Sequence, residues 1–585
     1  MLFSMRNFWY VRIFESVIRE LARRGHAVHI CAEQGEGKAR ARDWNEAASA
    51  LSHESSHITF EWTPRHIEDD WVDLRVMVHL GLDYLRFLEP EYANAPVLGA
   101  RARERTPPFL VRLANLPLLR TRTGLGLLAW ALRIAERAMP FDAELAAYVG
   151  RHRPDVLLIT PLLTLGSEQQ DVLRAARSLG VPSALCVGSW DHLSSKALLR
   201  QLPDRVFVWN EIQREEAIAL HGMSPEAVTV TGAQCFDQWF DRQPTLDREA
   251  FCRKVGLDPA RPFILYACSA LFEGSPNEAQ WVVQWMAALR QSGDARLAEA
   301  GILIRPHPKR GFEWDEVDVT ELPNVSLWPP TPTAPFDAES KADYFDSMFH
   351  SAAVVGLNTS ALIEAGIVGR AVHTILLPEF EQNQEGTLHF HYLLDQGLLR
   401  SARSLSSHLV QLAEAVGASN PAVHHNRAFV EQFVRPYGLA TPATPLFADG
   451  IESLAQEGTV PHREPRWLAA VRIALTPLAW YTSGTFANQV HRQRRRRLKL
   501  QKRQAERSAA IARREQHKRT KREERMARVA QLRLAKQERR ERTVEAKLQA
   551  REAWRASKRR RQQRQLFNAR VTAYYRRLIR RFSIH

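Results

Sequence analysis

Residues 301–310 read Gly-Ile-Leu-Ile-Arg-Pro-His-Pro-Lys-Arg, and residues 354–364 read Val-Val-Gly-Leu-Asn-Thr-Ser-Ala-Leu-Ile-Glu. Each stretch is a short apolar strand that ends in polar side chains. In an open parallel α/β sheet, ligands bind just outside the carboxyl ends of the strands. The second stretch also runs directly into a predicted helix, whose amino end offers amide groups to an anion. The two strand ends therefore combine cationic side chains with a helix end, an arrangement that suits a nucleotide diphosphate.

The polar residues at these strand ends are candidate donor-binding groups. His307 lies between Pro306 and Pro308, which fix φ and stiffen the turn, so the imidazole is well placed to donate to a phosphate or stabilise leaving-group charge. Glu364 lies four residues after Ser360, too far to complete a capping box, so its carboxylate is available for ribose hydroxyls. The plain alternatives are a surface histidine and a helix cap. The candidate set is Arg305, His307, Lys309, Asn358, Thr359, Ser360 and Glu364.

A second group of candidates lies on the predicted acceptor side. Residues 188–192 read Gly-Ser-Trp-Asp-His and follow an apolar strand-like run. Asp191 therefore also follows a strand end, where a carboxylate can act as general base toward an acceptor hydroxyl. The alternative is that Asp191 only caps the next helix. The other candidates for the acceptor side of the cleft are Arg6, Arg12, His192, Glu385 and His389.

Strand-like and helical runs alternate over most of the chain, which predicts doubly wound α/β sheets. The predicted strands are 1–5, 27–32, 58–62, 156–160, 184–188, 206–209, 228–232, 263–269, 301–305, 325–328, 353–357 and 372–376. The predicted organisation is a Rossmann-like acceptor domain over 1–243, a linker over 244–262, a Rossmann-like nucleotide-donor domain over 263–425, closing helices with an apolar segment over 426–482, and a basic helical tail over 483–585.

Neither a metal site nor a membrane span is predicted. The five cysteines are scattered without a CxxC pair, and their apolar surroundings suit buried thiols in a reducing cytosol. Glu385, His389 and His391 lie close together, but no spacing among them enforces metal binding. No run of about eighteen uncharged apolar residues is present, so no transmembrane helix is predicted.

The net charge of +16 is concentrated in the tail. Residues 491–585 contain 35 Lys+Arg and 8 Asp+Glu, whereas the rest of the chain contains 46 and 57. Near the end of the tail, an apolar helical stripe runs between arginines, which is typical of a helix lying in an anionic membrane surface. Binding of RNA and a plain solvated helix are the alternatives. The stripe includes Phe567, Val571, Tyr574, Leu578 and Phe582.

Together, these motifs resemble the GT-B superfamily of transferases. Residues 305–308 and 358–364 are similar to elements of CDP-glycerol glycerophosphotransferases and capsule polymerases, in which the histidine and the Ser/Thr element hold the donor phosphates. The second element also resembles UDP-N-acetylglucosamine 2-epimerases and related glycosyltransferases, in which the glutamate holds the ribose. The resemblance covers roughly residues 1–440, and residues 19–28 resemble the first helix-to-strand passage of GT-B enzymes. Bulky residues at 7–10 replace the usual glycine-rich first turn.

The resemblance implies a GT-B transferase that moves a sugar or polyol-phosphate group from a nucleotide-sugar or CDP-polyol donor to a surface-polysaccharide or glycolipid acceptor. It also implies that no metal or other cofactor is required, because cations of the protein neutralise the leaving diphosphate. The expected location is cytoplasmic and peripheral at the inner membrane face, with Asp191 and His307 as catalytic residues. A UDP-sugar 2-epimerase-like enzyme, and an RNA- or membrane-binding protein with a non-catalytic body, stay open as alternatives.

Overall fold

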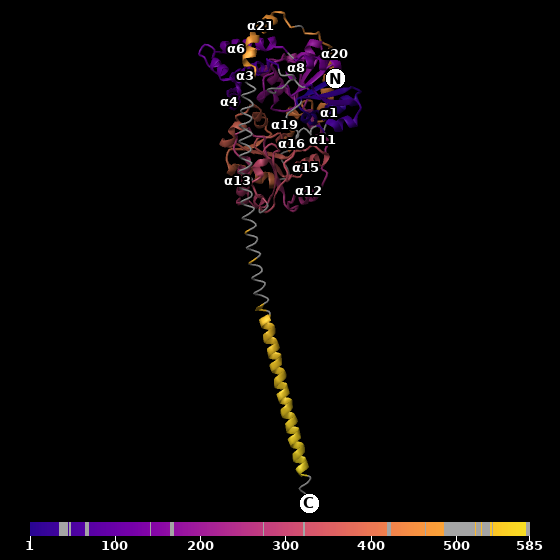
Figure 1. Cartoon of the computed structure of the whole chain (residues 1–585), viewed down its shortest axis with the longest axis vertical. Coiled ribbons are helices and arrows are strands. Elements are labelled where there is room, and N and C mark those ends of the chain that lie inside the picture. Colours follow the sequence, from indigo (N-terminus) through magenta and orange to yellow (C-terminus); the bar gives the residue numbers. More distant parts are fainter. Residues whose placement is uncertain are drawn as a thin grey trace. The chain divides into compact units, whose positions relative to one another are not determined.

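The computed structural model describes most of the chain, in two compact units, Met1–Phe486 and Ala487–His585. In the second unit, residues 542–580 form one continuous helix (Figure 1). For residues 423–425 only the backbone is described. The residues left out are 34–44, 46–47, 65–68, 141, 164–168, 273, 320–321, 418–422, 463, 485–520, 522–527, 529–538, 541 and 581–585.

Seven parallel strands form the first sheet, in the order β3-β2-β1-β4-β5-β6-β7. The strands are β1 (Leu2–Met5), β2 (Val28–Ala32), β3 (Ile58–Trp62), β4 (Leu157–Thr160), β5 (Ser183–Cys186), β6 (Arg205–Val208) and β7 (Val228–Val230). The central strands are short apolar runs buried on both faces, as expected where helices cover a parallel sheet on both sides. The order reverses between β1 and β4, which is the topological switch point of a Rossmann fold.

Six parallel strands form the second sheet, in the order β10-β9-β8-β11-β12-β13, which repeats the Rossmann order. The strands are β8 (Phe263–Ala267), β9 (Gly301–Arg305), β10 (Val325–Leu327), β11 (Ala353–Val355), β12 (Ala371–Ile375) and β13 (Arg400–Ala402). The two sheets confirm the predicted α/β class with two Rossmann-like domains. Each predicted strand has a counterpart whose ends agree within two residues, and β13 was not predicted.

Helices cover both sheets. In the first domain they are α1 (Val11–Arg23), α3 (Val72–Arg86), α4 (Pro96–Arg105), α5 (Pro108–Ala114), α6 (Arg122–Ala138), α7 (Ala143–His152), α8 (Gln169–Leu179), α9 (His192–Ser195), α10 (Glu211–His221) and α11 (Asp237–Asp241). Those that follow are α12 (Arg248–Val255), α13 (Glu278–Arg290), α14 (Ala295–Ala298), α15 (Ala338–Phe349), α16 (Ala361–Ile367), α17 (Leu388–Asp395), α18 (Leu405–Gly417), α19 (Val423–Phe433), α20 (Ala443–Glu457) and α21 (Trp467–Thr482).

Helix α1 shows how the local sequence builds these layers. Phe14, Val17, Ile18 and Leu21 recur at helical spacing and are all fully buried against the first sheet. The ring of Phe14 meets that of Phe3 on β1 edge-on, with 5.2 Å between the centroids. Burial of each such side chain contributes about 1.5–3 kcal/mol. These apolar residues therefore form the ordinary helix core that the sequence predicts.

Four helices, α3 to α6, are inserted between β3 and β4 of the first sheet. Helix α3 packs against α4, α5 and α6, and α21 packs against both α6 and α3. Figure 1 shows α3, α6 and α21 at the end of this unit opposite to α12, α13 and α15. The inserted helices therefore add a second, all-helical layer to the first domain.

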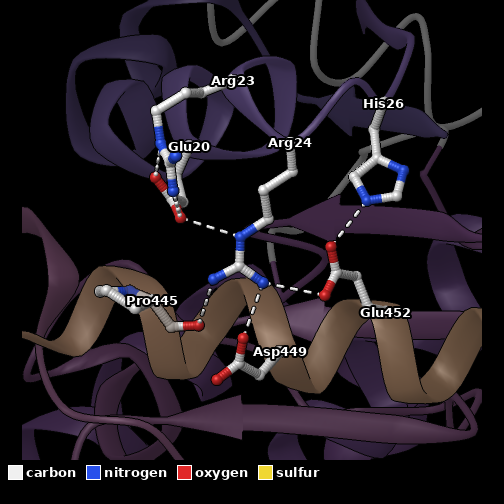
Figure 2. Close-up of polar contacts among 7 residues, drawn as sticks. All are labelled: Glu20, Arg23, Arg24, His26, Pro445, Asp449 and Glu452. Atoms are coloured by element: carbon white, nitrogen blue, oxygen red, sulfur yellow. Dashed lines mark hydrogen bonds and ion pairs between the residues drawn. The ribbon is translucent and has the colours of Figure 1, made fainter.

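After the second domain, the chain returns to the first one through α20, which packs against α1 and β6. Figure 2 shows the polar side of this contact. Arg24 donates from Nη1 to Glu452 (2.8 Å) and Asp449 (2.6 Å), and His26 Nε2 lies 2.7 Å from the second oxygen of Glu452 (Figure 2). The first domain is thus completed by a helix that follows the second domain in sequence.

A buried carboxylate fixes the point where this return begins. Asp237 on α11 accepts a hydrogen bond from the Arg435 guanidinium (2.9 Å) and further ones from the amides of Ala443 (3.0 Å) and Thr444 (2.6 Å). Asp237 and Arg435 are only 8% and 5% exposed. Buried charges are tolerated when they are paired and hydrogen-bonded in this way. One aspartate therefore anchors the start of α20.

Candidate active site in the interdomain cleft

A cleft of about 1060 Å³ lies between the two sheets of the Met1–Phe486 unit. Its lining comes from loops that follow the carboxyl ends of strands in both domains. These loops contribute Arg6 after β1, Pro161 after β4, Gly188–His192 after β5, Ala270–Phe272 after β8, His307 and Lys309 after β9, and Asn358–Ser360 after β11. Ligands of open α/β sheets bind at this position.

His307 is a neutral hydrogen-bond donor in this cleft. Its Nδ1 accepts a hydrogen bond from the amide of Lys309 (3.2 Å), so the proton of the neutral ring is on Nε2. Burial, together with the nearby charges of Lys309, Arg12 and Arg310, lowers the pKa of His307 to about 4. The stiff turn therefore presents one N–H group, beside an exposed lysine, toward the cleft.

The Asn358–Ser360 segment lines the cleft but caps α16 only weakly. The Asn358 side-chain amide donates to the carbonyl of Asn383 and to Nε2 of His389 (3.4 Å), so it points away from the helix end. Ser360 is the N-cap residue, is exposed and makes no side-chain capping bond. Thr359 accepts a long hydrogen bond from the Ala361 amide (3.4 Å). The predicted cap is thus wrong for Asn358 and Ser360, and the hydroxyl of Ser360 is available to a ligand.

Helix α16 is also shorter than the anion-site prediction assumes. It spans only Ala361–Ile367, seven residues. Two turns of helix contribute a small dipole, so the side chains beside it carry most of any attraction for phosphate. Any anion bound at this strand end would therefore be held mainly by His307, Lys309 and the hydroxyls.

Glu364 lines the cleft and is held by Tyr344 of α15. The hydroxyl of Tyr344 donates to Oε2 of Glu364. Burial raises the pKa of Glu364 to about 7, opposed by this hydrogen bond and by the charges of Arg12 and Arg305. Since only one carboxylate oxygen faces Tyr344, the other can accept from a ligand hydroxyl.

Arg305 does not line the cleft, in contrast to the prediction. Its guanidinium lies 4.6 Å from the centroid of the Tyr344 ring, and the residue is only 8% exposed. Arg305 therefore supports Tyr344 through this contact, and its positive charge lowers the pKa of Glu364.

Arg12 of the first domain supplies the cation that faces Glu364. Its guanidinium lies over the Trp9 ring, 4.6 Å from the centroid, and lines the cleft together with Arg6. Burial lowers the pKa of Arg12, and the charge of Glu364 opposes that shift. The bulky residues of the first turn therefore form a cation–π support for Arg12.

Asp191 lines the cleft but is already fully engaged. Its carboxylate accepts hydrogen bonds from Ser189 (2.6 Å), Ser195 (3.0 Å) and Lys196 (2.6 Å). Burial would raise its pKa, but Lys196, His389 and the Ser189 hydrogen bond hold it well below the usual range. A general base works best when its pKa lies near the working pH. The geometry thus favours a fixed negative charge at Asp191 over the predicted base.

The remaining predicted cleft residues divide into three cases. His389 lines the cleft and meets Trp190 of the other domain edge-on, with 4.7 Å between centroids. His192 also lines it, but its Nδ1 accepts from the Gly188 amide (3.2 Å), which ties down the loop. Glu385 is not among the lining residues, because it forms an ion pair with Arg403. For both histidines, burial lowers the pKa to about 4.

Sequence inspection missed one wall of the cleft. It is lined by Leu80 and Asp83 of α3, by Phe87 directly after α3, and by Arg101 and Arg105 of α4. These residues have no motif around them, because ordinary helical spacing places them there. The tertiary contact of α3 with the loop after β5 brings them to the cleft, as when the Leu198 amide donates to Asp83 (2.8 Å).

Metal ligands are not gathered in the cleft among the described residues. One group outside it, His29, Glu61 and His152, has ligand atoms within 4.8 Å of one another. The two imidazoles stack at 4.2 Å, and Glu61 lies 3.0 Å from His152 and 3.3 Å from His29. Glu61 therefore contacts both imidazoles, in a cluster that lies outside the cleft.

The tail residues of the apolar stripe lie on the helix 542–580 and are solvent-exposed, for example Phe567 (65%) and Tyr574 (64%). Val571 and Leu578 are each 36% exposed. Phe582 lies outside the described residues. Within the described part of the chain, no helix is both long and apolar enough to cross a membrane. Membrane binding by the tail stays a prediction.

No protein-family model and no curated protein matches the chain. Among solved structures, it is similar to a UDP-GlcNAc 2-epimerase from Neisseria meningitidis bound to UDP-GlcNAc, with 12% identity, 77% of this chain and 99% of that chain covered, and a TM-score of 0.44. It is also similar to WaaG, a glycosyltransferase involved in lipopolysaccharide biosynthesis (12% identity, 77% and 99% covered, TM-score 0.38). A further similar structure is a glycosyltransferase from Rickettsia africae, with 8% identity, 78% of this chain and 97% of that chain covered, and a TM-score of 0.42. Likeness at this level says nothing about activity.

Proposed function

We propose that the chain is a GT-B-type transferase that moves a sugar or polyol-phosphate group from a nucleotide-activated donor to a surface-polysaccharide or glycolipid acceptor. One observation carries this proposal. The hydrogen-bond donor of His307, the ammonium group of Lys309 and the tyrosine-bound carboxylate of Glu364 all line one cleft between two Rossmann sheets. Groups suited to binding phosphate and ribose thus lie in the same cleft, which supports the proposal.

The donor is expected to bind against the second domain. The Nε2–H of His307, the hydroxyls of Thr359 and Ser360, and Lys309 would contact its phosphates. A bound phosphate raises the pKa of His307, because it favours the protonated ring. As the bond to the leaving group breaks, these donors neutralise the charge that develops on the phosphate. The carboxylate oxygen of Glu364 that Tyr344 leaves unused would accept from a ribose hydroxyl.

The acceptor is expected on the side of the first domain. The cleft there is bounded by α3 and α4 and by the loop that carries Asp191. A volume of about 1060 Å³ lies at the upper end of the range for small-molecule sites. Space for a second substrate beside the nucleotide favours a transferase over a one-substrate epimerase.

The acceptor's proton would pass to a base on the same side of the cleft. Asp191 stays the proposed base, and Lys196 would have to release it before it could accept a proton. His389 is the other group at this place. Its Nε2 accepts from the Asn358 side-chain amide (3.4 Å), so the neutral ring carries its proton on the buried Nδ1, and Asn358 would have to release Nε2 before His389 could accept a second proton.

The test is turnover by the full chain with a panel of UDP-, CDP- and GDP-linked sugars and CDP-polyols, with and without lipid and glycan extracts. Release of nucleotide that depends on an added acceptor supports transfer. Conversion of a UDP-sugar in the absence of any acceptor would instead support the epimerase alternative. Failure of every donor to turn over, in a protein whose circular dichroism shows it folded, would contradict both enzymatic proposals.

A further inference from the structure

The inserted helices and α21 carry large apolar side chains that are open to solvent. On and before α6 these are Leu118 (88% exposed), Leu127 (60%) and Trp130 (61%). On α21 they are Ile473 (74%), Trp480 (66%) and Tyr481 (83%). A single exposed apolar residue is ordinary, but several on neighbouring helices mark an interaction surface. These six residues define the α6–α21 surface.

The two helices form one packed unit beneath this surface. Ala479 of α21 is fully buried in the apolar cluster that includes Ala129, Leu132 and Ala135 of α6. Arg472 of α21 donates from Nε to the carbonyl of Ala138 at the end of α6 (2.7 Å). Figure 1 shows α6 and α21 beside each other at one end of the unit. The exposed side chains therefore stand on a shared, rigid support.

Helix α21 has the composition of a buried helix, although one side of it is exposed. Arg472 is the only charged residue among its 16, and its guanidinium is turned toward Ala138 and Glu464. A helix that is apolar all round is normally enclosed by protein or lipid. Sixteen residues are too few to span a bilayer, so such a helix would lie in the plane of the interface. Trp467 at its start, with Trp480 and Tyr481 at its end, suits that depth.

The side of this surface formed by the inserted helices is mainly positive, whereas Glu464 and Asp70 lie beside α21, where Glu464 is paired with Arg174 and Arg472. Apart from Arg101 and Arg105, which line the cleft, residues 96–138 contain six exposed arginines and two glutamates. Glu136, one of the two, is buried and lies 3.0 Å from His79 and 3.2 Å from Arg200. Basic clusters beside an apolar interfacial helix attract anionic lipids, whereas they would repel a second copy of the same surface.

We propose that the α6–α21 surface is a docking site for an anionic lipid bilayer, separate from the C-terminal stripe. Trp130, Ile473, Trp480 and Tyr481 enter the headgroup region, and the surrounding arginines contact lipid phosphates.

Docking of this surface also has a consequence for the acceptor. This consequence rests on the proposed function. Helix α3 lines the cleft with Leu80 and Asp83, and it packs against α6 and α21. The helical wall of the cleft is therefore one helix away from the docked bilayer. This places an amphiphilic acceptor, held in the membrane by its lipid, next to the proposed acceptor side.

The experiment is sedimentation of the full chain with vesicles of phosphatidylcholine alone or with one-third phosphatidylglycerol, in low and high salt. The surface variant combines Leu127→Ser, Ile473→Ser and Trp480→Ser. The tail variant combines Phe567→Ser, Tyr574→Ser and Leu578→Ser. Phe312→Ser with Val410→Ser is the matched control, since these residues of the second domain are 67% and 61% exposed.

The surface variant is expected to lose at least roughly tenfold of its partitioning into anionic vesicles, and the control none. Retention of wild-type binding by the surface variant would overturn the proposal. So would a change in its oligomeric state by light scattering without a change in vesicle binding, because a second copy would then cover the surface.

Two further measurements test the docking and the proposed function separately. Brominated phosphatidylcholine is expected to quench tryptophan emission of the wild type more than that of the conservative variant Trp480→Phe, and equal quenching contradicts the docking. Nucleotide binding is measured on the same samples. Vesicle binding without nucleotide binding in the wild type would support the docking proposal and contradict the proposed transferase function.

Discussion

The hydroxyl of Tyr344 donates a hydrogen bond to Oε2 of Glu364 at the wall of the interdomain cleft. Tyr344 is held in turn by Arg305, whose guanidinium lies 4.6 Å from its ring centroid. The pair therefore sets both the direction and the protonation of the carboxylate that is proposed to bind ribose. Burial raises the pKa of Glu364 to about 7, and the hydrogen bond from Tyr344 keeps it from rising further.

Removal of the Tyr344 hydroxyl is expected to move the pH dependence of nucleotide binding. A ribose hydroxyl donates best to the ionised carboxylate, so affinity should fall as the pH drops through the pKa of Glu364, near 7. In Tyr344→Phe the midpoint should move to higher pH, because a hydrogen bond that favours the charged form is lost. Calorimetric titrations between pH 5.5 and 8.5 measure this. An unchanged midpoint, or a pH dependence that survives in Glu364→Gln, contradicts the assigned role.

Glu278 should make the protein less stable as the pH rises, and it supports the site indirectly. It accepts from the Ser269 amide (2.8 Å), and the Ser269 hydroxyl accepts from the Asn358 amide (3.0 Å). Burial raises the pKa of Glu278 to about 8, with the hydrogen bond from Ser269 opposing the shift. The folded state then binds the proton more tightly than the unfolded state, so its contribution to stability falls as the pH rises from about 4.5 to 8.

The matched variant is Glu278→Gln, which keeps the shape of the protonated acid. Its free energy of unfolding should lack that part of the pH dependence and exceed the wild-type value by roughly 4 kcal/mol at pH 8, because each unit of the pKa shift corresponds to about 1.4 kcal/mol. Urea denaturation at pH 6 and pH 8 gives the two differences. A variant that is equally destabilised at both pH values shows that the carboxyl is not protonated in the folded protein.

If Asp191 is the base, Lys196 is expected to set the pH at which kcat/KM falls on the acidic side of its pH profile. Lys196 donates to Asp191 (2.6 Å) and is the charge that most strongly lowers its pKa. In Lys196→Met the pKa of Asp191 should rise, so the acid limb of kcat/KM should move to higher pH. Loss of activity at all pH values with an unmoved limb would instead identify Asp191 as a fixed charge.

Asp237 is expected to be a major contributor to stability, because its removal leaves Arg435 buried and unpaired. Asp237→Ala should lower the free energy of unfolding by about 3–5 kcal/mol. Glu249→Ala is the control, since Glu249 pairs with Arg253 on an open surface, and the expected cost is below about 1 kcal/mol. Chemical denaturation measures both. Equal costs would show that α20 is not anchored by Asp237.

The sequence predicted the positions of most strands because buried parallel strands are short continuous apolar runs between turns. It did not predict β13, whose three residues Arg400–Ala402 include two that are only half-buried. Residues that follow strands closely, such as His307 and Asn358, were predicted to lie in the cleft because the topology of the sheet alone brings them there. This is the part of the site that local sequence determines.

Tertiary packing determines the positions of those site residues that a single sequence does not predict. Arg305 was expected to face the donor, but its guanidinium packs on the ring of Tyr344, 39 residues away in the sequence. Glu385 was expected in the cleft, but Arg403 draws its carboxylate elsewhere. Tyr344 itself has no motif around it, and its role depends on its contacts with Arg305 and Glu364. Such partners come from distant segments, so a single sequence offers no signal for them.

A thermal-shift titration with UDP, CDP, GDP and CMP tests the central claim most directly, on the full-length wild type, His307→Ala and the exposed control Val410→Ser. A ligand that binds only the folded state raises its melting temperature, by an amount that grows with ligand concentration. We expect at least one nucleotide to stabilise the wild type and the control, and this shift to disappear in His307→Ala. No shift with any nucleotide, or an equal shift in all three proteins, would contradict nucleotide-donor binding at this cleft.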